Sequence, residues 1–139
     1  MAEAGNASER IAACACGNLT VAVRGEPVEI YACSCTSCQR RSGSAFTYAA
    51  LYLETVVTIA GDHKTWPQPS EAGRLVDGSF CPTCGVSVFF RGEGLPGLVG
   101  VRVGCFADPG FAKPSRLYWA SRKHRWLDLG GAIPKVEKQ

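Results

Sequence analysis

The sequence predicts a mostly β protein folded as a single domain, and three observations carry this prediction. Short segments rich in β-branched and aromatic residues are separated by stretches that contain glycine or proline, as strands joined by turns would be. No segment shows a convincing helical spacing of apolar residues. A chain of 139 residues is long enough to bury one core and too short for two ordinary domains.

The expected strands follow one another along most of the chain. They cover residues 19–23, 28–32, 45–53, 56–59, 74–80, 86–91 and 99–103. Residues 63–73 contain Pro67, Pro69 and Gly73, so we expect a surface loop there. The first ten residues have no apolar core and do not resemble a secretory signal. We therefore expect a disordered tail at residues 1–11, the domain at 12–129 and a C-terminal tail at 130–139.

The composition and charge argue against several classes of protein. Hydrophobic residues make up 46% of the chain and charged residues 19%, which is typical of a globular protein, and no apolar run approaches the length of a membrane span. Without a secretory signal, we expect a cytoplasmic protein whose eight cysteines are reduced. The net charge of +3 counts every cysteine as neutral, and seven thiolates with two zinc ions would lower it to about zero. We therefore expect neither a membrane nor a nucleic-acid partner.

Three cysteines within six residues form the most informative motif of the chain. Cys33, Cys35 and Cys38 follow the spacing Cys-x-Cys-x-x-Cys, which lets three sulfurs converge on one metal ion. A tetrahedral zinc ion with three protein ligands keeps its fourth position open for water or substrate, as catalytic zinc does. Two alternatives stay open at this point: a disulfide with a spare thiol, and a structural zinc whose fourth ligand comes from elsewhere.

A second set of cysteines indicates a structural metal site. Cys81 and Cys84 belong to a Cys-Pro-x-Cys-Gly motif, in which a tight turn directs both sulfurs toward one ion. A redox pair would need a following helix to lower a thiol pKa, whereas residues 86–90 favour a strand. Cys14 and Cys16 form the other isolated pair. Together the two pairs would make a closed site with four thiolate ligands.

The order of these motifs resembles the glutathione-dependent formaldehyde-activating enzyme family, also called the centromere protein V/GFA family. The resemblance extends over roughly residues 12–127 and rests on three motifs: Cys14-x-Cys16-Gly17, Cys33-x-Cys35-x-x-Cys38-Gln39-Arg40-x-Ser42-Gly43 and Phe80-Cys81-x-x-Cys84-Gly85. The chain departs from the family pattern at residues 105–108 and at Arg116, where a histidine is common. These departures concern the substrate more than the fold.

The resemblance implies an Mss4-like fold, in which small antiparallel sheets are pinned by a structural zinc ion. It also implies two zinc ions per chain, one structural and one catalytic. The structural ligands would be Cys14, Cys16, Cys81 and Cys84, and the catalytic ligands Cys33, Cys35 and Cys38. The implied activity is that of a zinc-dependent carbon–sulfur lyase resembling S-(hydroxymethyl)glutathione synthase. Such an enzyme adds a thiol such as glutathione to formaldehyde or another small aldehyde, so a small-molecule thiol and an aldehyde would be the partners.

Two arginines, one further cysteine and two histidines also lie in or near the segments that carry these motifs. Arg40 matches a basic position of the family motif, so we expect it to help bind the thiol substrate. Arg40 and Arg41 directly follow the ligand loop and are both candidates to offset the negative charge of three thiolates, and the alternative for each is a solvated surface position. Cys105 stands alone and is expected to be a small buried residue. His63 and His124 have no cysteine at ligand spacing, and neither is offered as a ligand.

Two other classes of function stay open on the sequence. The Mss4-like fold also serves non-enzymatic zinc-binding interaction modules, although a pure scaffold has no use for an open coordination position. A role like that of the methionine sulfoxide reductases would need a separate catalytic cysteine, for which Cys105 is the candidate. The basic and aromatic segment 113–126 is expected to close the core and to present a solvated face or attract the carboxylates of a peptide thiol. The sequence leaves the formation of a homo-oligomer open.

Overall fold

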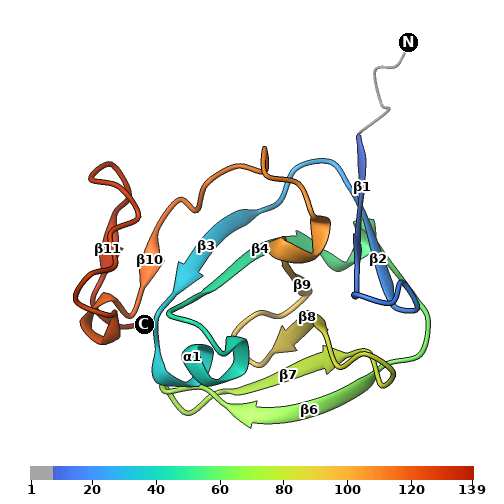
Figure 1. The fold of residues 1–139 in the computed structure, drawn as a ribbon, viewed down its shortest axis with the longest axis horizontal. Coiled ribbons are helices and arrows are strands. Elements are labelled where there is room, and N and C mark those ends of the chain that lie inside the picture. The colour runs from blue at the N-terminus through green and yellow to red at the C-terminus, as the bar shows by residue number, and fades with distance from the viewer. Residues whose placement is uncertain (1–7) are drawn as a thin grey trace.

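The computed structural model describes residues 8–139, and within that range it contains two β-sheets and one short α-helix (Figure 1). The small sheet has the strand order β1-β2-β5, and the large sheet has the order β11-β10-β3-β4-β9-β8-β7-β6. The strands are β1 Glu9–Ala13, β2 Thr20–Arg24, β3 Glu29–Cys33, β4 Thr47–Leu53, β5 Val57–Ala60, β6 Lys64–Pro69, β7 Leu75–Phe80, β8 Ser87–Gly92, β9 Leu98–Arg102, β10 Leu117–Tyr118 and β11 Lys135–Val136. The helix α1 is Thr36–Ser42, and short 3-10 helices lie at η1 Glu54–Val56, η2 Val103–Phe106 and η3 Ala120–Arg122. The expectation of a mostly β protein is therefore confirmed.

The main core lies between the small sheet and one face of the large sheet. In the small sheet, β2 pairs antiparallel with both β1 and β5. Successive residues of a strand point to opposite faces, and Val21 and Val23 of β2 are fully buried. They belong to one buried cluster with Tyr52 of β4, Phe89 of β8 and Val101 of β9. The small sheet thus covers one face of the large sheet and leaves the opposite face uncovered by it.

The opposite face of the large sheet carries a row of residues from neighbouring strands. Tyr31 of β3 lies beside Ala49 of β4, and Ala49 lies beside Arg102 of β9. Two residues earlier on β9, Gly100 lies beside Phe90 of β8. Because alternate residues of a strand share a face, these positions lie on the side away from the main core.

The sequence indicates no helix, and α1 corrects that expectation. The helix has seven residues, of which only Cys38 is buried, so there is no apolar periodicity to detect. Its start is capped by the Cys35 sulfur, which accepts a hydrogen bond from the backbone amide of Cys38. It ends at Gly43, whose φ of 64° is the left-handed conformation that favours glycine. The cysteine motif itself therefore begins the helix.

The segment expected to be a surface loop at residues 63–73 contains the strand β6. This strand pairs antiparallel with β7 at one edge of the large sheet. Pro67 and Pro69 argue against a central strand but are compatible with an edge strand, because an edge residue can lack an amide hydrogen without breaking a ladder. The loop is shorter than expected and is closed by a hydrogen bond from the Ser70 amide to the Arg74 carbonyl oxygen, at 2.7 Å.

The ends of the described chain also belong to the sheets. Strand β1 begins at Glu9, and β11 pairs in parallel with β10. Both strands extend into the expected tails at residues 1–11 and 130–139, because β11 has only two residues and β1, although as long as β2, contains a single β-branched residue, Ile11. Residues 1–7 of the expected N-terminal tail lie outside the described residues. Among the described residues, no helix has the length and apolar character needed to span a membrane.

Candidate metal centres and their cavity

Four cysteines from two distant turns form a compact group. The sulfurs of Cys14, Cys16, Cys81 and Cys84 all lie within 4.8 Å of one another. The Cys16 sulfur lies 3.7 Å from that of Cys14 and 3.6 Å from that of Cys81. Zinc–sulfur bonds of 2.3 Å in a tetrahedron require sulfurs about 3.8 Å apart. The spacing of this group therefore fits a four-coordinate zinc ion.

Backbone amides point toward the sulfurs of this group. The amide of Leu19 donates to the Cys14 sulfur at 3.2 Å, and the amide of Thr83 donates to the Cys81 sulfur at 3.3 Å. The tight turn after Cys81 is completed by Gly85, which has a φ of 79° and whose amide donates to the Cys81 carbonyl oxygen. Hydrogen bonds of this kind favour the thiolate form that a metal needs. The group links the turn after β1 to the turn between β7 and β8.

Three further cysteines meet on the opposite side of the large sheet. Cys33 is the last residue of β3, Cys35 caps α1, and Cys38 lies in the first turn of that helix. All three are buried, and their sulfurs lie within 4.8 Å of one another. Hydrogen bonds with the Cys33 and Cys35 thiols lower the pKa of the Cys38 thiol to about 2, whereas hydrogen bonds with Cys35 and Cys38 raise the pKa of Cys33. The donor set and spacing suit a zinc ion with three thiolate ligands.

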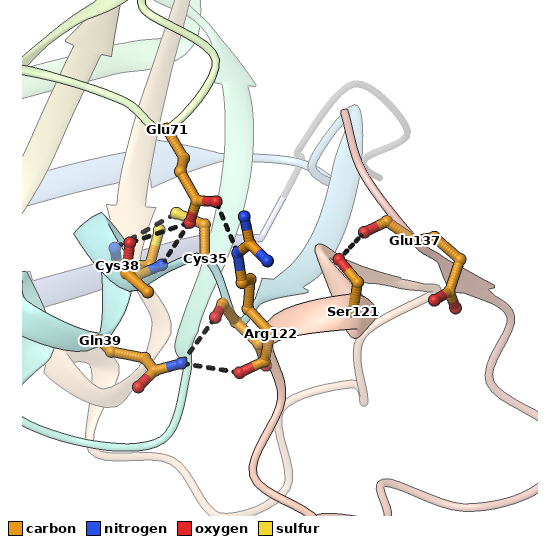
Figure 2. A network of polar contacts seen from close by, with 9 residues as sticks. Cys35, Cys38, Gln39, Glu71, Ser121, Arg122 and Glu137 are labelled. Carbon is orange, nitrogen blue, oxygen red and sulfur yellow. Dashed lines mark hydrogen bonds and ion pairs between the residues drawn. The ribbon is translucent and has the colours of Figure 1, made fainter.

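A network of polar contacts fixes α1 in place (Figure 2). One carboxylate oxygen of Glu71 accepts hydrogen bonds from the backbone amide and the hydroxyl of Thr36, both at 2.9 Å. The other oxygen accepts one from Nε of Arg122 at 2.7 Å. The side-chain amide of Gln39 donates to the carbonyl oxygens of Ser34 and Arg122. The helix that carries Cys38 is thereby held against the β6–β7 turn and against η3.

Replacing Glu71 by glutamine should weaken the protein in a pH-dependent way. The Thr36 amide and the Arg122 guanidinium lower the pKa of Glu71 below its ordinary value of 4.5. A carboxyl with a depressed pKa contributes stability above its unfolded pKa and loses it as the pH falls through the folded value. We expect Glu71→Gln to lower the free energy of unfolding by about 1 kcal/mol at pH 7. Chemical denaturation at several pH values should show this difference shrinking as the pH falls below 4.5 and through the lowered pKa of Glu71.

The control for this prediction is Glu137→Gln. Glu137 takes part in the same region only through its backbone oxygen, which accepts a hydrogen bond from the Ser121 hydroxyl (Figure 2). The Glu137→Gln variant should have the same free energy of unfolding as the original protein at every pH. A loss of stability in Glu71→Gln that is as large at pH 3 as at pH 7 would contradict a role for the ionised carboxylate.

The three-cysteine group opens onto a cavity of about 120 Å³. Besides the cysteines, its walls include Tyr31, Phe90, Tyr118 and Trp119. Trp119 is buried and packs against the three cysteines, with a left-handed φ of 56° that is rare for a bulky residue. Strain of this kind persists only where surrounding contacts enforce it, and it is common at functional sites. The sulfurs therefore face a small space whose walls combine aromatic and aliphatic side chains with charged ones.

Three arginines line the same cavity; Arg74 is exposed, and the other two hold buried donor atoms there. Arg41 of α1 and Arg102 of β9 both line it. In each side chain, the Nη2 atom is buried and has no hydrogen-bond partner among the described residues. Burial lowers the pKa of Arg102, but an arginine keeps its charge in proteins even so. Glu29 also lines the cavity, where it already accepts a hydrogen bond from the Tyr118 hydroxyl at 2.8 Å.

The comparison with known proteins agrees with this geometry. The family model described as "Glutathione-dependent formaldehyde-activating enzyme" (GFA) matches residues 9–122. This chain belongs to the GFA family. A crystal structure of a Rhodobacter sphaeroides protein from a structural genomics programme superimposes with a TM-score of 0.56 and 21% sequence identity, covering 73% of this chain and 90% of that chain. That likeness concerns the fold alone. The search of curated proteins found no match.

In this GFA protein, the seven cysteines of the sequence motifs gather into the two groups that their spacing predicts. Arg40 lies elsewhere, because its side chain is exposed and borders a separate hollow beside His124 and Trp126. Cys105 is half-buried outside both groups, and its thiol donates to the Ser87 carbonyl oxygen at 3.5 Å.

Sequence reasoning ranked Arg41 below Arg40 as a source of positive charge at the site, and it missed Arg102. Arg41 stands three residues after Cys38, and residues three apart share one side of a helix. That signal becomes usable only once α1 is recognised. Arg102 carries no local signal, because it reaches the cavity through the pairing of β9 with β4. His63 is exposed and meets the Phe89 ring edge-on, so it belongs to neither cysteine group.

Proposed function

We propose that this protein is a zinc-dependent carbon–sulfur lyase, which adds a thiol such as glutathione to formaldehyde or another small aldehyde. The observation that carries the proposal is the difference between the two cysteine groups. The four-cysteine group can satisfy a tetrahedral metal completely, whereas the three-cysteine group leaves one position and opens onto a cavity. Membership of the GFA family adds support, since the family is named after this activity.

The residues of the cavity can each be given a task in this reaction. A bound zinc ion would supply Lewis acidity, which favours the thiolate form of a thiol at neutral pH. Cys33, Cys35 and Cys38 would hold that ion. Tyr31 and Trp119 keep bulk water away from the sulfurs, which strengthens electrostatic interactions in the cavity. The cavity arginines offset the negative charge of the thiolates.

The overall reaction needs no oxidant or reductant. The thiol sulfur forms a bond to the carbonyl carbon of the aldehyde, and the electron pair of the carbonyl bond moves to oxygen. The oxygen takes up the proton that the thiol has lost. The product is a hydroxyalkyl thioether with the same atoms as the two reactants, so binding both in one orientation is the main task of the site.

Replacing Cys35 by serine should separate activity from folding. Cys35 lies in the three-cysteine group and away from the four-cysteine group. We expect the variant to stay folded, to contain about one zinc ion where the original protein contains about two, and to lose the thiol-dependent rate by at least about a hundredfold. Elemental analysis and NMR detection of the thiol–formaldehyde adduct, corrected for the uncatalysed reaction, measure the two quantities.

The matched control is Cys105→Ser, which removes a half-buried thiol that belongs to neither group. It should keep both zinc ions and its activity. If Cys35→Ser unfolds, the three-cysteine group is structural. If it stays folded and keeps its activity, the group is not catalytic. Full zinc content with no thiol-dependent rate in the original protein would favour an interaction module over an enzyme.

A further inference from the structure

The Arg102 side chain is held in the cavity in a way that leaves its hydrogen-bond donors free. Its guanidinium carbon lies 4.4 Å from the centre of the Phe90 ring. The ring in turn crosses β9 at Gly100, where a Cβ atom would lie only 2.1 Å from the ring. A stacked guanidinium is fixed in orientation, while its N–H groups point outward in its own plane. Gly100 and Phe90 thus form a platform for a charged group.

Arg41 reaches the same cavity from the helix. Its Nε donates to the side-chain oxygen of Gln68 at 3.2 Å, which fixes the base of the guanidinium and leaves the buried Nη2 without a partner among the described residues. The charge of Arg41 also helps to lower the pKa of Arg102, after burial as the main cause, so the two cations influence each other. Two like charges with buried, unpaired donors are costly to hold together, and the nearby thiolates offset the charge without accepting a hydrogen bond from either Nη2 atom.

We propose that Arg41 and Arg102 form a carboxylate-binding subsite, and that the substrate is a small thiol carrying a carboxylate. The proposal rests on the proposed function, because it places the thiol at Cys33, Cys35 and Cys38 and the carboxylate at the arginines of the same cavity. The planar guanidinium presents paired donors that match the two oxygens of a carboxylate. Glu29, the acidic residue among those lining the cavity, accepts a hydrogen bond from the Tyr118 hydroxyl and lies 3.7 Å from Nε of Arg116, so its carboxylate already has partners other than Arg41 and Arg102.

The size of the cavity limits the ligand. Its volume of about 120 Å³ is smaller than the roughly 300 Å³ at which pockets for drug-sized ligands begin. A mercapto acid of a few carbon atoms, or one carboxylated end of a larger thiol, is therefore the matching class. Inorganic phosphate shares the oxyanion chemistry of a carboxylate but has no sulfur for the cysteine group. The observations favour a ligand that satisfies both ends of the cavity.

The test compares two thiols that differ in one group. Cobalt-substituted protein is titrated with 3-mercaptopropionate and with 3-mercaptopropanol, and the visible spectrum reports coordination of sulfur. We expect the carboxylate to bind about tenfold or more tightly than the alcohol, as one charge-assisted pair would give. Arg41→Met and Arg102→Met should each bring this ratio close to one, because the loss of the positive charge that offsets the thiolates weakens both thiols equally, whereas the loss of the carboxylate contact weakens only 3-mercaptopropionate. Circular dichroism and metal content confirm that the variants are folded.

The matched control is Arg40→Met, which removes an exposed arginine of the same helix that does not line the cavity. It should keep the full preference for the carboxylate. Equal affinities for the two thiols in the original protein would overturn the proposal, and so would a preference that survives both cavity variants. If Arg40→Met lost as much of the carboxylate preference as Arg41→Met, the preference would reflect only the net charge of the protein. That result would also overturn the proposal.

A second measurement separates this proposal from the proposed function. Calorimetric titration of the zinc protein with propionate tests the arginines without any sulfur, and binding should be lost in Arg102→Met. If neither thiol changes the cobalt spectrum, the proposed function fails, and the subsite stands only if propionate binding still depends on both arginines. If phosphate displaces propionate and binds more tightly than 3-mercaptopropionate, the site is one for free phosphate and the carboxylate assignment is wrong.

Discussion

Replacing Cys81 by serine should give a chain that does not fold at room temperature. Cys81 is fully buried in the main core, and its sulfur accepts hydrogen bonds from the amides of Thr83 and Cys84 in the four-cysteine group. Structural zinc in small domains binds with about 10–16 kcal/mol, whereas an entire domain is stable by only about 5–15 kcal/mol. Losing one ligand should therefore remove most of the stability. Circular dichroism and amide NMR dispersion measure the loss.

A strong chelator should also unfold the original protein, because it removes the metal without any mutation. Prolonged treatment of the original protein with the chelator should unfold it, and added zinc should restore the fold. Cys105→Ser is the control, since it also removes a sulfur near the core but leaves both cysteine groups complete. A Cys81→Ser variant that melts at the original temperature would show that the four cysteines do not hold a structural metal.

Replacing Gly100 by alanine should destabilise the protein by about 2–3 kcal/mol, although alanine is normally the better residue in a strand. The new Cβ would lie 2.1 Å from the Phe90 ring, a separation that real atoms do not reach, so the ring must leave its position. Phe90 of β8 is buried and carries the stacked Arg102 guanidinium on its ring, so moving the ring would break that contact as well. Denaturant unfolding of the variant measures the cost.

Two further variants distinguish this clash from a general effect of alanine. Gly104 has open space around its Cα atom and no left-handed φ, so Gly104→Ala should be close to neutral. Combining Gly100→Ala with Phe90→Leu should cost less than the sum of the two single changes, because the shorter side chain makes room for the Cβ. Strict additivity of the two changes would contradict the ring contact as the cause.

The cysteine groups could be predicted from the sequence because the information is local. A spacing of one or two residues between thiols determines whether their sulfurs can meet at one ion, whatever the rest of the chain does. Grouping the Cys14 and Cys16 pair with the Cys81 and Cys84 pair followed from counting ligands. The strands were predictable for a similar reason, since their composition and the turn residues around them are visible within a few positions.

The parts that could not be predicted depend on pairing between distant segments. Arg102 belongs to the cavity because β9 pairs with β4, and no feature near Arg102 in the sequence records that register. Helix α1 is held by Glu71 and Arg122, which lie 35 and more residues away from its first turn. Its seven residues are too few to form a stable helix alone. Tertiary contacts thus decided both the position of the arginines and the existence of the helix.

The prolines of β6 also affect whether another strand can pair with the exposed edge of the large sheet. An unpaired edge strand is a template on which a strand of another molecule can align. Pro67 and Pro69 have no amide hydrogen to offer, and the opposite edge is formed by β11, a strand of only two residues. Growth of the sheet by adding strands is therefore blocked at both ends. If two copies of this chain associate through the β6 edge of the large sheet, side chains such as the exposed Trp66 have to make the contact in place of backbone pairing.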